Sequence, residues 1–400
     1  MKLVKIPPQK YYDYKCDVMF NAFKWDPQVG DTVTIADNIL VIEQSLATKL
    51  ENMSEKLAKE TTEIEEYLLN NPTHAQKLGL HKDVLLALKE IKNYDRNKHI
   101  RLMRFDFHPT AEGFKVSEVN SDVPAGAAES SILPNIAKHF FEQGYTTGGV
   151  IEAVTDSLLS LVKPYSKVGF VYSSKYVEDK QVLVGFENAL AKNNIDYAYL
   201  SPNEINWRDN KPYILQNNQE QELDAIMRYY PAEWLSNYAK YNWKGYFTTN
   251  VTSCNHPISL YSQSKRLPLI WDDIGLDLPT WRQLLPKTTA PRLDNFFESD
   301  WVYKPAMSRV GDGISIREAI SDKEYKDIIK QVKKKPQNWV SQKKFTSVPI
   351  VDEIGDEYHV CIGVFTVNGK SAGFYGRLSK LSRVDDKAID VPILINKDEV

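Results

Sequence analysis

The sequence predicts a mixed α/β fold that contains a parallel sheet. Strand and helix patterns alternate along the chain, with short apolar strands at Lys167 to Tyr172, Ile195 to Leu200 and Leu223 to Tyr229, and a helix at Val182 to Lys192. Such alternation is typical of parallel sheets, because parallel neighbours need a crossover connection that is usually a helix. Beyond residue 300 the pattern becomes richer in strands, which adds an α+β character to the expected fold.

The composition is that of an ordinary globular protein. With 400 residues, the chain can hold two or three domains or one large enzyme unit. Hydrophobic residues make up 42% and charged residues 26%, and the formal net charge is -3. Because there is no global basic field, we expect neither nucleic acid nor an anionic membrane as a partner.

Targeting signals and a disulfide framework are both unexpected. The N-terminal segment lacks the apolar core of a signal peptide, and no apolar run approaches the roughly 18 residues of a membrane span. Cys16, Cys254 and Cys361 are few, odd in number and widely spaced, which favours a reducing cytoplasm. Cys361 lies in the apolar run VCIGVF and is interpreted as a core residue.

Other elements follow from local periodicity and turn residues. In chain order we expect a strand at Thr32 to Val41, helices at Ile42 to Asn71 and His81 to Ile91, a helix near Asn135 to Glu142, strands at Trp301 to Lys304 and Ile314 to Arg317 around a turn at Ser308 to Gly313, a helix at Asp322 to Lys334, a strand at Trp339 to Gln342 and a hairpin at Tyr358 to Ser379.

A β-hairpin at 101–120 carries unusual polar side chains. Its arms are Arg101 to Phe107 and Phe114 to Asn120, joined by a turn at Pro109 to Gly113. Side chains two residues apart share a face of a strand, so four polar groups fall on one face, with Arg104 opposite Glu118. The four are Arg104, Asp106, Glu118 and Asn120.

Two carboxylates and an amide oxygen on one face form a hard, oxygen-only ligand set. Such a set suits Mg²⁺ better than zinc or iron. A plainer alternative is an arginine–carboxylate pair, with Asn120 at the strand end holding the sheet to the following loop. Spacing alone leaves both interpretations open.

The hairpin resembles a known signature. RFDF, a short turn, GFKVSEVNSD and a loop of small residues are similar to the glutathionylspermidine synthase family, whose members are ATP-grasp carboxylate–amine ligases. The segment NHPISLYSQSKRLPLIW at 255–271 extends the resemblance. It implies that Asp106, Glu118 and Asn120 bind Mg²⁺ and that Arg104 lies at the reacting acyl phosphate.

The resemblance also implies a nucleotide site in the last quarter of the chain. Asp312-Gly313 is a good hairpin turn by itself, yet a glycine-containing turn can also fold over a triphosphate. In an ATP-grasp lobe, Lys304, Gly311 and Gly313 are expected at the phosphates. Gln342 and Phe345 match residues near adenine.

Arg377 matches an arginine that the family carries on a mobile loop near the transferred phosphate. The acidic residues that follow it in the family are absent here, because Leu378, Ser379 and Lys380 take their places. Closure of the loop is therefore expected to differ in detail.

The resemblance implies an ATP-grasp fold with a preceding α/β pre-ATP-grasp region. We place the first part at 1–290, including the metal hairpin 101–122, and the nucleotide-binding lobe with its closing hairpin at 291–400. No room remains before the helix at Ile42 for the amidase domain of the two-headed family members, so we expect a synthetase domain only.

The expected activity is an ATP-dependent ligase that joins a carboxylate to an amine through an acyl phosphate, with ATP and Mg²⁺ as cofactors. Arg104 and Arg377 are the expected catalytic residues, stabilising negative charge on the transferred phosphoryl group. The expected partners are a small-molecule or peptide acid and an amine, with a polyamine among the candidates. A small-molecule kinase and a non-catalytic nucleotide-binding protein are the alternatives.

The loop after the hairpin, Ser121 to Pro134, concerns the substrates. Its small residues would let a ligand approach the backbone, and a polar rim from Asp122 to Glu129 could hold an amine. In glutathionylspermidine-forming members this loop carries serines that bind glutathione. Aligned on Asn120, those positions hold Val123 and Ala125, so a different acid is expected.

Overall fold

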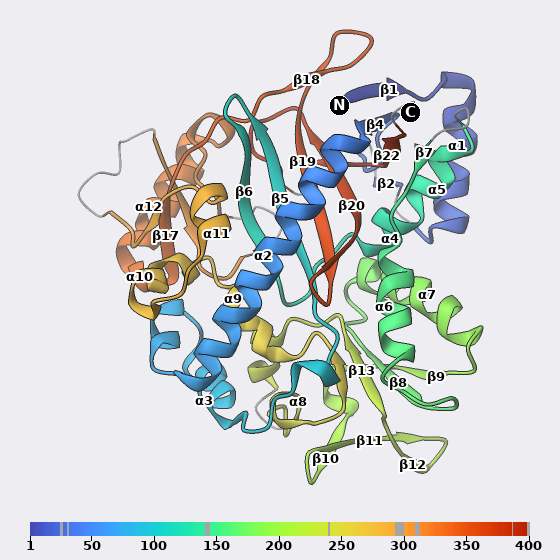
Figure 1. The fold of residues 1–400 in the computed structure, drawn as a ribbon, viewed down its shortest axis with the longest axis vertical. Helices are drawn as coiled ribbons and strands as arrows, with labels where there is room; N and C mark the ends of the chain where they lie inside the picture. The colour runs from blue at the N-terminus through green and yellow to red at the C-terminus, as the bar shows by residue number, and fades with distance from the viewer. Residues whose placement is uncertain are drawn as a thin grey trace.

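The largest sheet combines strands from the middle and the end of the chain (Figure 1). The computed structural model describes residues 1–24, 27–29, 32–140, 145–238, 241–292, 300–308, 313–385 and 387–397. In spatial order the sheet contains β21 (Ile389–Val391), β20 (Lys370–Ser379), β19 (Glu357–Val367), β5 (Leu102–Thr110) and β6 (Gly113–Asn120), with β18 (Ile350–Val351) paired to β19.

Helices cover both faces of this sheet. The long helix α2 (Gln44–Asn70) runs across β19 and β20, while α4 (Ala127–Ser131) and α6 (Val150–Leu159) pack against the same two strands (Figure 1). The sheet thus contains strands from both sides of residue 290. The division at 290 stays a prediction.

The sequence predicts one hairpin of this sheet correctly and the register of another incorrectly. β19 and β20 join through Asn368-Gly369, whose φ angles of 51° and 83° suit the type I′ turn that this dipeptide favours. In contrast, the predicted register of the β5–β6 hairpin is wrong. Arg104 lies opposite Asn120 rather than Glu118, because the turn comprises only Ala111 and Glu112 and a β-bulge follows.

The bulge places two residues of β6, Ser117 and Glu118, opposite the single residue Asp106. Both ends of the shifted register are well paired, with Phe105 opposite Val119 and Phe107 opposite Val116. Glu118 and Asn120 therefore stay on the face of the hairpin that carries Asp106.

The predicted parallel sheet is confirmed. Its order is β14 (Thr252–Cys254), β13 (Ala225–Arg228), β8 (Lys167–Val171) and β9 (Asp196–Leu200), and all three pairings are parallel. Helix α7 (Val177–Ala191) is the crossover between β8 and β9. A separate antiparallel sheet contains β10 (Asn206–Arg208), β11 (Lys211–Gln216) and β12 (Gln219–Glu222).

Another sheet carries the elements of the last quarter of the chain. It contains β15 (Thr288–Thr289), β17 (Trp339–Lys343) and β16 (Trp301–Pro305), with α12 (Asp322–Lys334) packed nearby. The predicted strand Ile314 to Arg317 is wrong. Ser315 Oγ accepts the N–H of Tyr303 at 2.7 Å, which removes a donor that strand pairing would use, and a 3₁₀ turn at Arg317–Ala319 follows.

The two ends of the chain meet in a further sheet, ordered β1 (Lys2–Lys5), β4 (Asn38–Glu43), β22 (Ile393–Asn396) and β7 (Tyr145–Thr146) (Figure 1). The predicted strand Thr32 to Val41 is instead two strands, β3 (Thr32–Val33), paired to β2 (Gln28–Val29), and β4.

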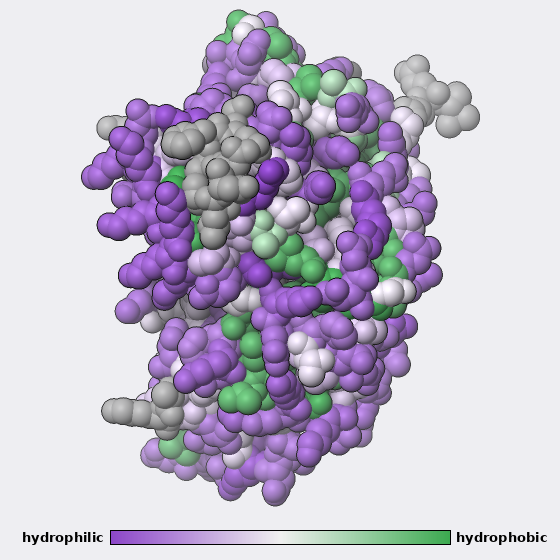
Figure 2. Space-filling model, turned by 90° about the vertical axis from the view of Figure 1, so that its left-hand side faces the viewer, coloured by the Kyte–Doolittle hydropathy of each residue, from purple (hydrophilic) through white to green (hydrophobic). Residues whose placement is uncertain are grey.

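The remaining helices are α1 (Pro8–Asn21), α3 (Lys82–Glu90), α5 (Leu133–Lys138), α8 (Gly245–Thr248), α9 (Leu260–Gln263), α10 (Trp271–Ile274) and α11 (Pro279–Leu284). In the described part of the chain, no helix is both long and apolar enough to cross a bilayer. The face shown in Figure 2 is mainly hydrophilic, with apolar side chains gathered in a hollow near its centre.

A buried ion pair joins the end of β6 to the parallel sheet. Arg228, on β13, donates to both oxygens of Asp122, at 2.5 and 3.2 Å. The Ala232 N–H and the Ser259 hydroxyl also donate to this carboxylate, at 2.8 and 2.9 Å. Since both charged side chains are essentially inaccessible, each depends on the other for its charge compensation.

Asn255 and Arg101 extend this contact to the hairpin and to α2. The Asn255 amide exchanges hydrogen bonds of 2.7 Å with the backbone of Leu102 and donates to the Ser121 carbonyl at 3.1 Å. Arg101 binds the Glu65 carboxylate at 2.5 and 3.0 Å and the same Ser121 carbonyl at 2.7 Å. We call the following residues the polar clamp: Glu65, Arg101, Asp122, Arg228 and Asn255.

The polar clamp should be essential for stability. Asp122→Asn leaves the buried Arg228 guanidinium without a counter-ion, so we expect a loss of about 3–5 kcal/mol in the free energy of unfolding, measured by urea denaturation. The control Glu220→Gln breaks the exposed pair with Arg208 and should cost about 1 kcal/mol or less. Equal, small losses in both variants would contradict the assignment.

Candidate functional site

A cavity of about 830 Å³ lies between the hairpin β5–β6, the sheet of β16 and β17, and the segment that ends in β21. Among the described residues, every site residue predicted from the sequence except Gly313 lines it. These residues are Arg104, Asp106, Glu118, Asn120, Lys304, Gln342, Phe345 and Arg377. The polar face of the hairpin therefore looks into the cavity.

Arg104 and Asp106 form a buried, bidentate ion pair. Nε of Arg104 lies 2.7 Å from Oδ1 of Asp106, and Nη2 lies 3.0 Å from Oδ2. Asn120 donates its side-chain amide to Oδ2 at 3.0 Å, and Arg104 donates to the carbonyl of Ala125 at 2.5 Å. Tyr375 lies under the guanidinium, 4.9 Å from the ring centre. This arrangement fixes Arg104 at the cavity wall.

Close packing also holds Arg104 in place. A Cβ atom added to Gly363, on the neighbouring strand β19, would lie only 2.7 Å from Cδ of Arg104. The side chain of Arg104 thus occupies the space above a glycine. Although burial opposes the charged form, Asp106 outweighs this effect and raises the pKa of Arg104, which remains a permanent cation.

Glu118 sits between two lysines that come from other parts of the chain. Lys265 Nζ lies 2.9 Å from Oε2 of Glu118, and Lys304 Nζ donates to the carbonyl of Ser117 at 3.3 Å. Burial favours the neutral carboxyl group, but Lys265 and Lys304 outweigh it and lower the pKa of Glu118 to about 2. Glu118 is therefore ionised at neutral pH.

Lys304 titrates far below an ordinary lysine. Burial lowers its pKa to about 8, with Lys265 acting in the same direction, while Glu118 and Asp106 oppose the shift. Most of the Lys304 amines still carry a proton at pH 7. A bound anion would favour the charged form further, so Lys304 suits a phosphate ligand.

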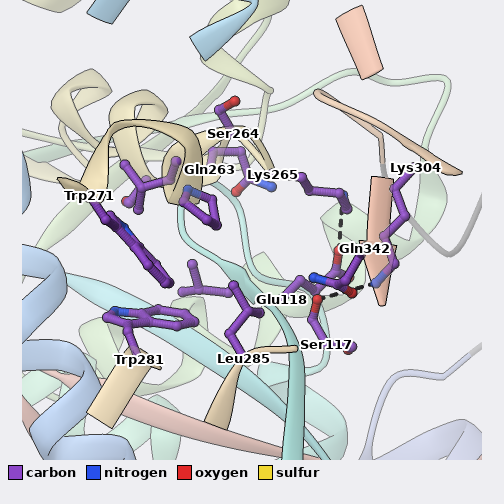
Figure 3. A pocket seen from close by; sticks show the side chains of 14 residues that line it. Ser117, Glu118, Gln263, Ser264, Lys265, Trp271, Trp281, Leu285, Lys304 and Gln342 are labelled. Atoms are coloured by element: carbon purple, nitrogen blue, oxygen red, sulfur yellow. Dashed lines mark hydrogen bonds and ion pairs between the residues drawn. The ribbon is translucent and has the colours of Figure 1, made fainter. Parts of the chain in front are cut away.

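A second, small cavity of about 30 Å³ lies behind Glu118 and Lys304 (Figure 3). Trp271, Trp281 and Leu285 line its apolar side, and Gln342 lies at the boundary that it shares with the large cavity. Its volume accommodates about two water molecules. It is too small for a purine and belongs to the wall of the candidate site.

Gln342 and Phe345 lie beside the hairpin. Gln342 donates to the Thr288 hydroxyl at 2.9 Å across the β15–β17 pair, and the Phe345 ring lies 5.3 Å from the ring of His108. His108 contacts the Ser117 hydroxyl at 3.1 Å. Burial lowers the pKa of His108 to about 4, so this imidazole is neutral at pH 7.

Of the two predicted phosphate-loop glycines, Gly313 does not line the cavity. Gly311 lies outside the described residues. Gly313 adopts a left-handed φ of 70°, and a Cβ atom there would approach Pro305 Cγ to 2.9 Å. Gly313 is therefore required for the return of the chain past the end of β16.

Arg377 lies on strand β20, directly opposite Cys361, and lines the cavity. Its Nη2 donates to the carbonyl of Asp385, while no described residue accepts a hydrogen bond from its buried Nε. Cys361 is buried as predicted, and burial raises the pKa of its thiol, so it is not a thiolate nucleophile.

Several residues of the cavity were not predicted. Lys24 pairs with Asp390 at 2.9 Å and with Glu129 at 3.3 Å, and Tyr375 donates to Asp390 at 2.7 Å. Lys265 falls in the segment that resembled the family, but its role beside Glu118 had no local signal. In contrast to Glu129, Asp122 does not reach the cavity wall, because it is buried in the polar clamp.

The donor set is compatible with Mg²⁺. No three His, Cys, Asp or Glu side chains in the described ranges gather as a metal cluster. A magnesium ion here would therefore use the Asp106 and Glu118 carboxylates, the Asn120 amide oxygen, and phosphates and water, a set this ion commonly accepts. Although both carboxylates already contact cations, each oxygen has two lone pairs and can accept a further partner.

Comparison with known proteins identifies the family of this chain. The family described as glutathionylspermidine synthase preATP-grasp matches residues 9–396. The chain belongs to this family. Membership in the glutathionylspermidine synthase family supports a ligase-type role. A comparison with curated proteins finds no similar sequence.

Two solved structures are similar to this glutathionylspermidine synthase family member to different degrees. A glutathione synthetase-like effector from Globodera pallida, in apo form, is 11% identical over 97% of both chains, with a TM-score of 0.65. A putative gamma-glutamylcysteine synthetase from Methylobacillus flagellatus is 9% identical over 82% of this chain and 84% of the other, with a TM-score of 0.42. The family match and the Globodera pallida structure confirm the α/β, ATP-grasp-related fold.

The electrostatic link between Glu118 and Lys304 can be measured directly. Glu118→Gln removes a negative charge that raises the pKa of Lys304, so this pKa should fall below about 8. NMR titration of the lysine amines, assigned with Lys304→Arg, measures the change. Glu112→Gln, at the exposed tip of the same hairpin, should leave the value unaltered; a Lys304 pKa unaffected by Glu118→Gln would refute the link.

Proposed function

We propose that the chain is an ATP-dependent carboxylate–amine ligase that forms an amide bond through an acyl phosphate. The observation that carries this proposal is the convergence of Lys304, from β16, on the charged face of the β5–β6 hairpin within one large cavity. Family membership supports the same assignment. A cytoplasmic location is proposed with it, supported by the three free cysteines.

Amide formation from a carboxylate requires a better leaving group than hydroxide. ATP can provide one by phosphorylating the acid, after which an amine attacks the acyl phosphate and phosphate leaves. Phosphoryl transfer depends mainly on alignment and on neutralising the charge of the phosphates. A cavity wall with several fixed cations, of which Arg104 and Lys304 are buried, suits this demand.

The roles combine the family resemblance with position in the cavity, except that those of the two glycines rest on the resemblance alone. Lys304 would contact the phosphates, and Gln342 with Phe345 would lie near adenine. Gly311 and Gly313 would belong to the loop over the triphosphate. Arg104 and Arg377 would stabilise the transferred phosphoryl group and then the tetrahedral oxyanion. No residue is assigned as a general base.

Asp106, Glu118 and Asn120 would hold Mg²⁺, which neutralises phosphate charge when it is bound. The residues themselves contribute more than ligand atoms. Asp106 aligns Arg104 through two hydrogen bonds, and Glu118 keeps Lys304 protonated up to a higher pH than burial alone would allow. The acid and the amine would occupy the rest of the cavity, where Glu129 and Asp390 are located.

A screen for ADP release over paired acids and amines tests the function. A ligase releases ADP only when both partners are present and yields a conjugate whose mass is the sum of the two less water. Release with the acid alone, together with a stable phosphorylated product, would instead indicate a small-molecule kinase on the same site. Nucleotide binding without any turnover would indicate a non-catalytic protein.

The hairpin carboxylates should be required for turnover. Asp106→Asn or Glu118→Gln removes a charged metal ligand and should reduce Mg²⁺-dependent ATP turnover by about a hundredfold or more. Circular dichroism checks that each variant keeps its fold, and Glu112→Gln should retain full activity. Turnover near normal in both site variants would exclude the hairpin as the metal site.

Glutathione with spermidine should be a poor substrate pair. Val123 and Ala125 line the cavity at positions where glutathionylspermidine-forming relatives carry serines, so two hydroxyl groups are missing. Each unpaired polar group of a buried substrate costs roughly 1–3 kcal/mol, about tenfold or more in affinity. Mass spectrometry after incubation with ATP decides: efficient formation of glutathionylspermidine would show that the missing serines do not matter.

A further inference from the structure

The wall of the large cavity contains an ammonium group supplied by the protein itself. Lys24 follows α1, and its Nζ lies 2.9 Å from Oδ2 of Asp390 and 3.3 Å from Oε1 of Glu129. The side chain of Lys24 is only 6% exposed, and those of Glu129 and Asp390 are 12% and 11% exposed. All three residues line the cavity.

The carboxylate pair is held rigidly around this ammonium group. The Tyr375 hydroxyl donates to Oδ1 of Asp390 at 2.7 Å, while Tyr375 packs against Gly126, where an added Cβ would lie 2.8 Å from the ring. Glu129 extends from α4, next to this glycine. Its Oε2 is buried and accepts no hydrogen bond from any described residue.

Two neighbouring buried carboxylates need a cation. Burial and the nearby charge of Asp390 raise the pKa of Glu129, while Lys24 acts in the opposite direction. Without Lys24, the pair would either take up a proton or bind another cation. An external ammonium group would have to displace Lys24, which is tethered to the same chain and therefore present at a high effective concentration.

We propose that Lys24 is a specificity-determining residue, which occupies the Glu129–Asp390 pair from within and closes this part of the cavity to the second ammonium group of a diamine. The inference rests on the proposed function for its substrate, because it concerns the amine of the ligase reaction. It predicts that the protein prefers an amine without a distal cationic group at this position.

Chemical rescue tests the proposal without any turnover. Lys24→Ala deletes three methylene groups and the ammonium group, a fragment that n-propylammonium replaces. We expect n-propylammonium to raise the melting temperature of Lys24→Ala and to bind this variant at least about tenfold more tightly than the unaltered protein. Sodium chloride controls for ionic strength, and 1-propanol controls for the neutral shape.

Two further variants make the result specific. Lys10→Ala removes an exposed lysine from α1 and should not create a propylammonium site. Glu129→Gln added to Lys24→Ala should abolish the rescue, because one carboxylate of the pair is lost. If Lys24→Ala does not fold in buffer, refolding with and without n-propylammonium provides the same comparison.

Absence of rescue in both the melting and the refolding experiments would overturn the proposal, as would an equal response to 1-propanol. The predicted preference among amine substrates is tested by a separate activity measurement. If the chain is a ligase, Lys24→Ala should gain activity with an α,ω-diamine relative to the monoamine of equal length. Rescue by n-propylammonium in a protein without ligase activity would support the ammonium site and refute only the proposed function.

Discussion

The buried ion pair between Asp122 and Arg228 is the contact on which the geometry of the cavity depends. It fixes the residue that follows β6 to a strand of the parallel sheet, and Asn255 and Arg101 hold the Ser121 carbonyl beside it. The chain direction after Asn120 is thereby set. Because Ala125 follows in the next loop and Glu129 in α4, the clamp helps to position both residues at the cavity wall.

The polar face of the hairpin was predicted correctly although its register was not. Relative to the predicted register, the observed turn shifts the strand pairing by one residue, and the bulge at Ser117 and Glu118 shifts it by one more. Two shifts of one residue restore the parity of a strand, so Glu118 and Asn120 return to the face of Arg104 and Asp106. Sequence parity could not reveal this, because neither shift has a distinctive local signal.

Local signals decided which elements could be predicted. The Asn368-Gly369 turn and the helix that begins after Ser321, whose hydroxyl accepts the Glu324 N–H at 3.2 Å, were evident from their sequence. Lys265 and Lys24 could not be found in this way. Their partners are far away in the chain, and one lysine in a polar segment looks like any other until the fold brings it to a carboxylate.

Charge pairing explains how a cavity so rich in ionised groups can exist without a ligand. Asp106 pairs with Arg104, Glu118 with Lys265, and Asp390 with Lys24, so each of these carboxylates is compensated from within. On the proposed function, Asp106 and Glu118 would hold Mg²⁺ while Arg104, Lys265 and Lys304 would face the phosphates, so that these charged side chains would exchange partners. Lys24 pairs with Glu129 and Asp390, which are not among the groups proposed for the metal or the phosphates, so this pair is suited to selecting the amine.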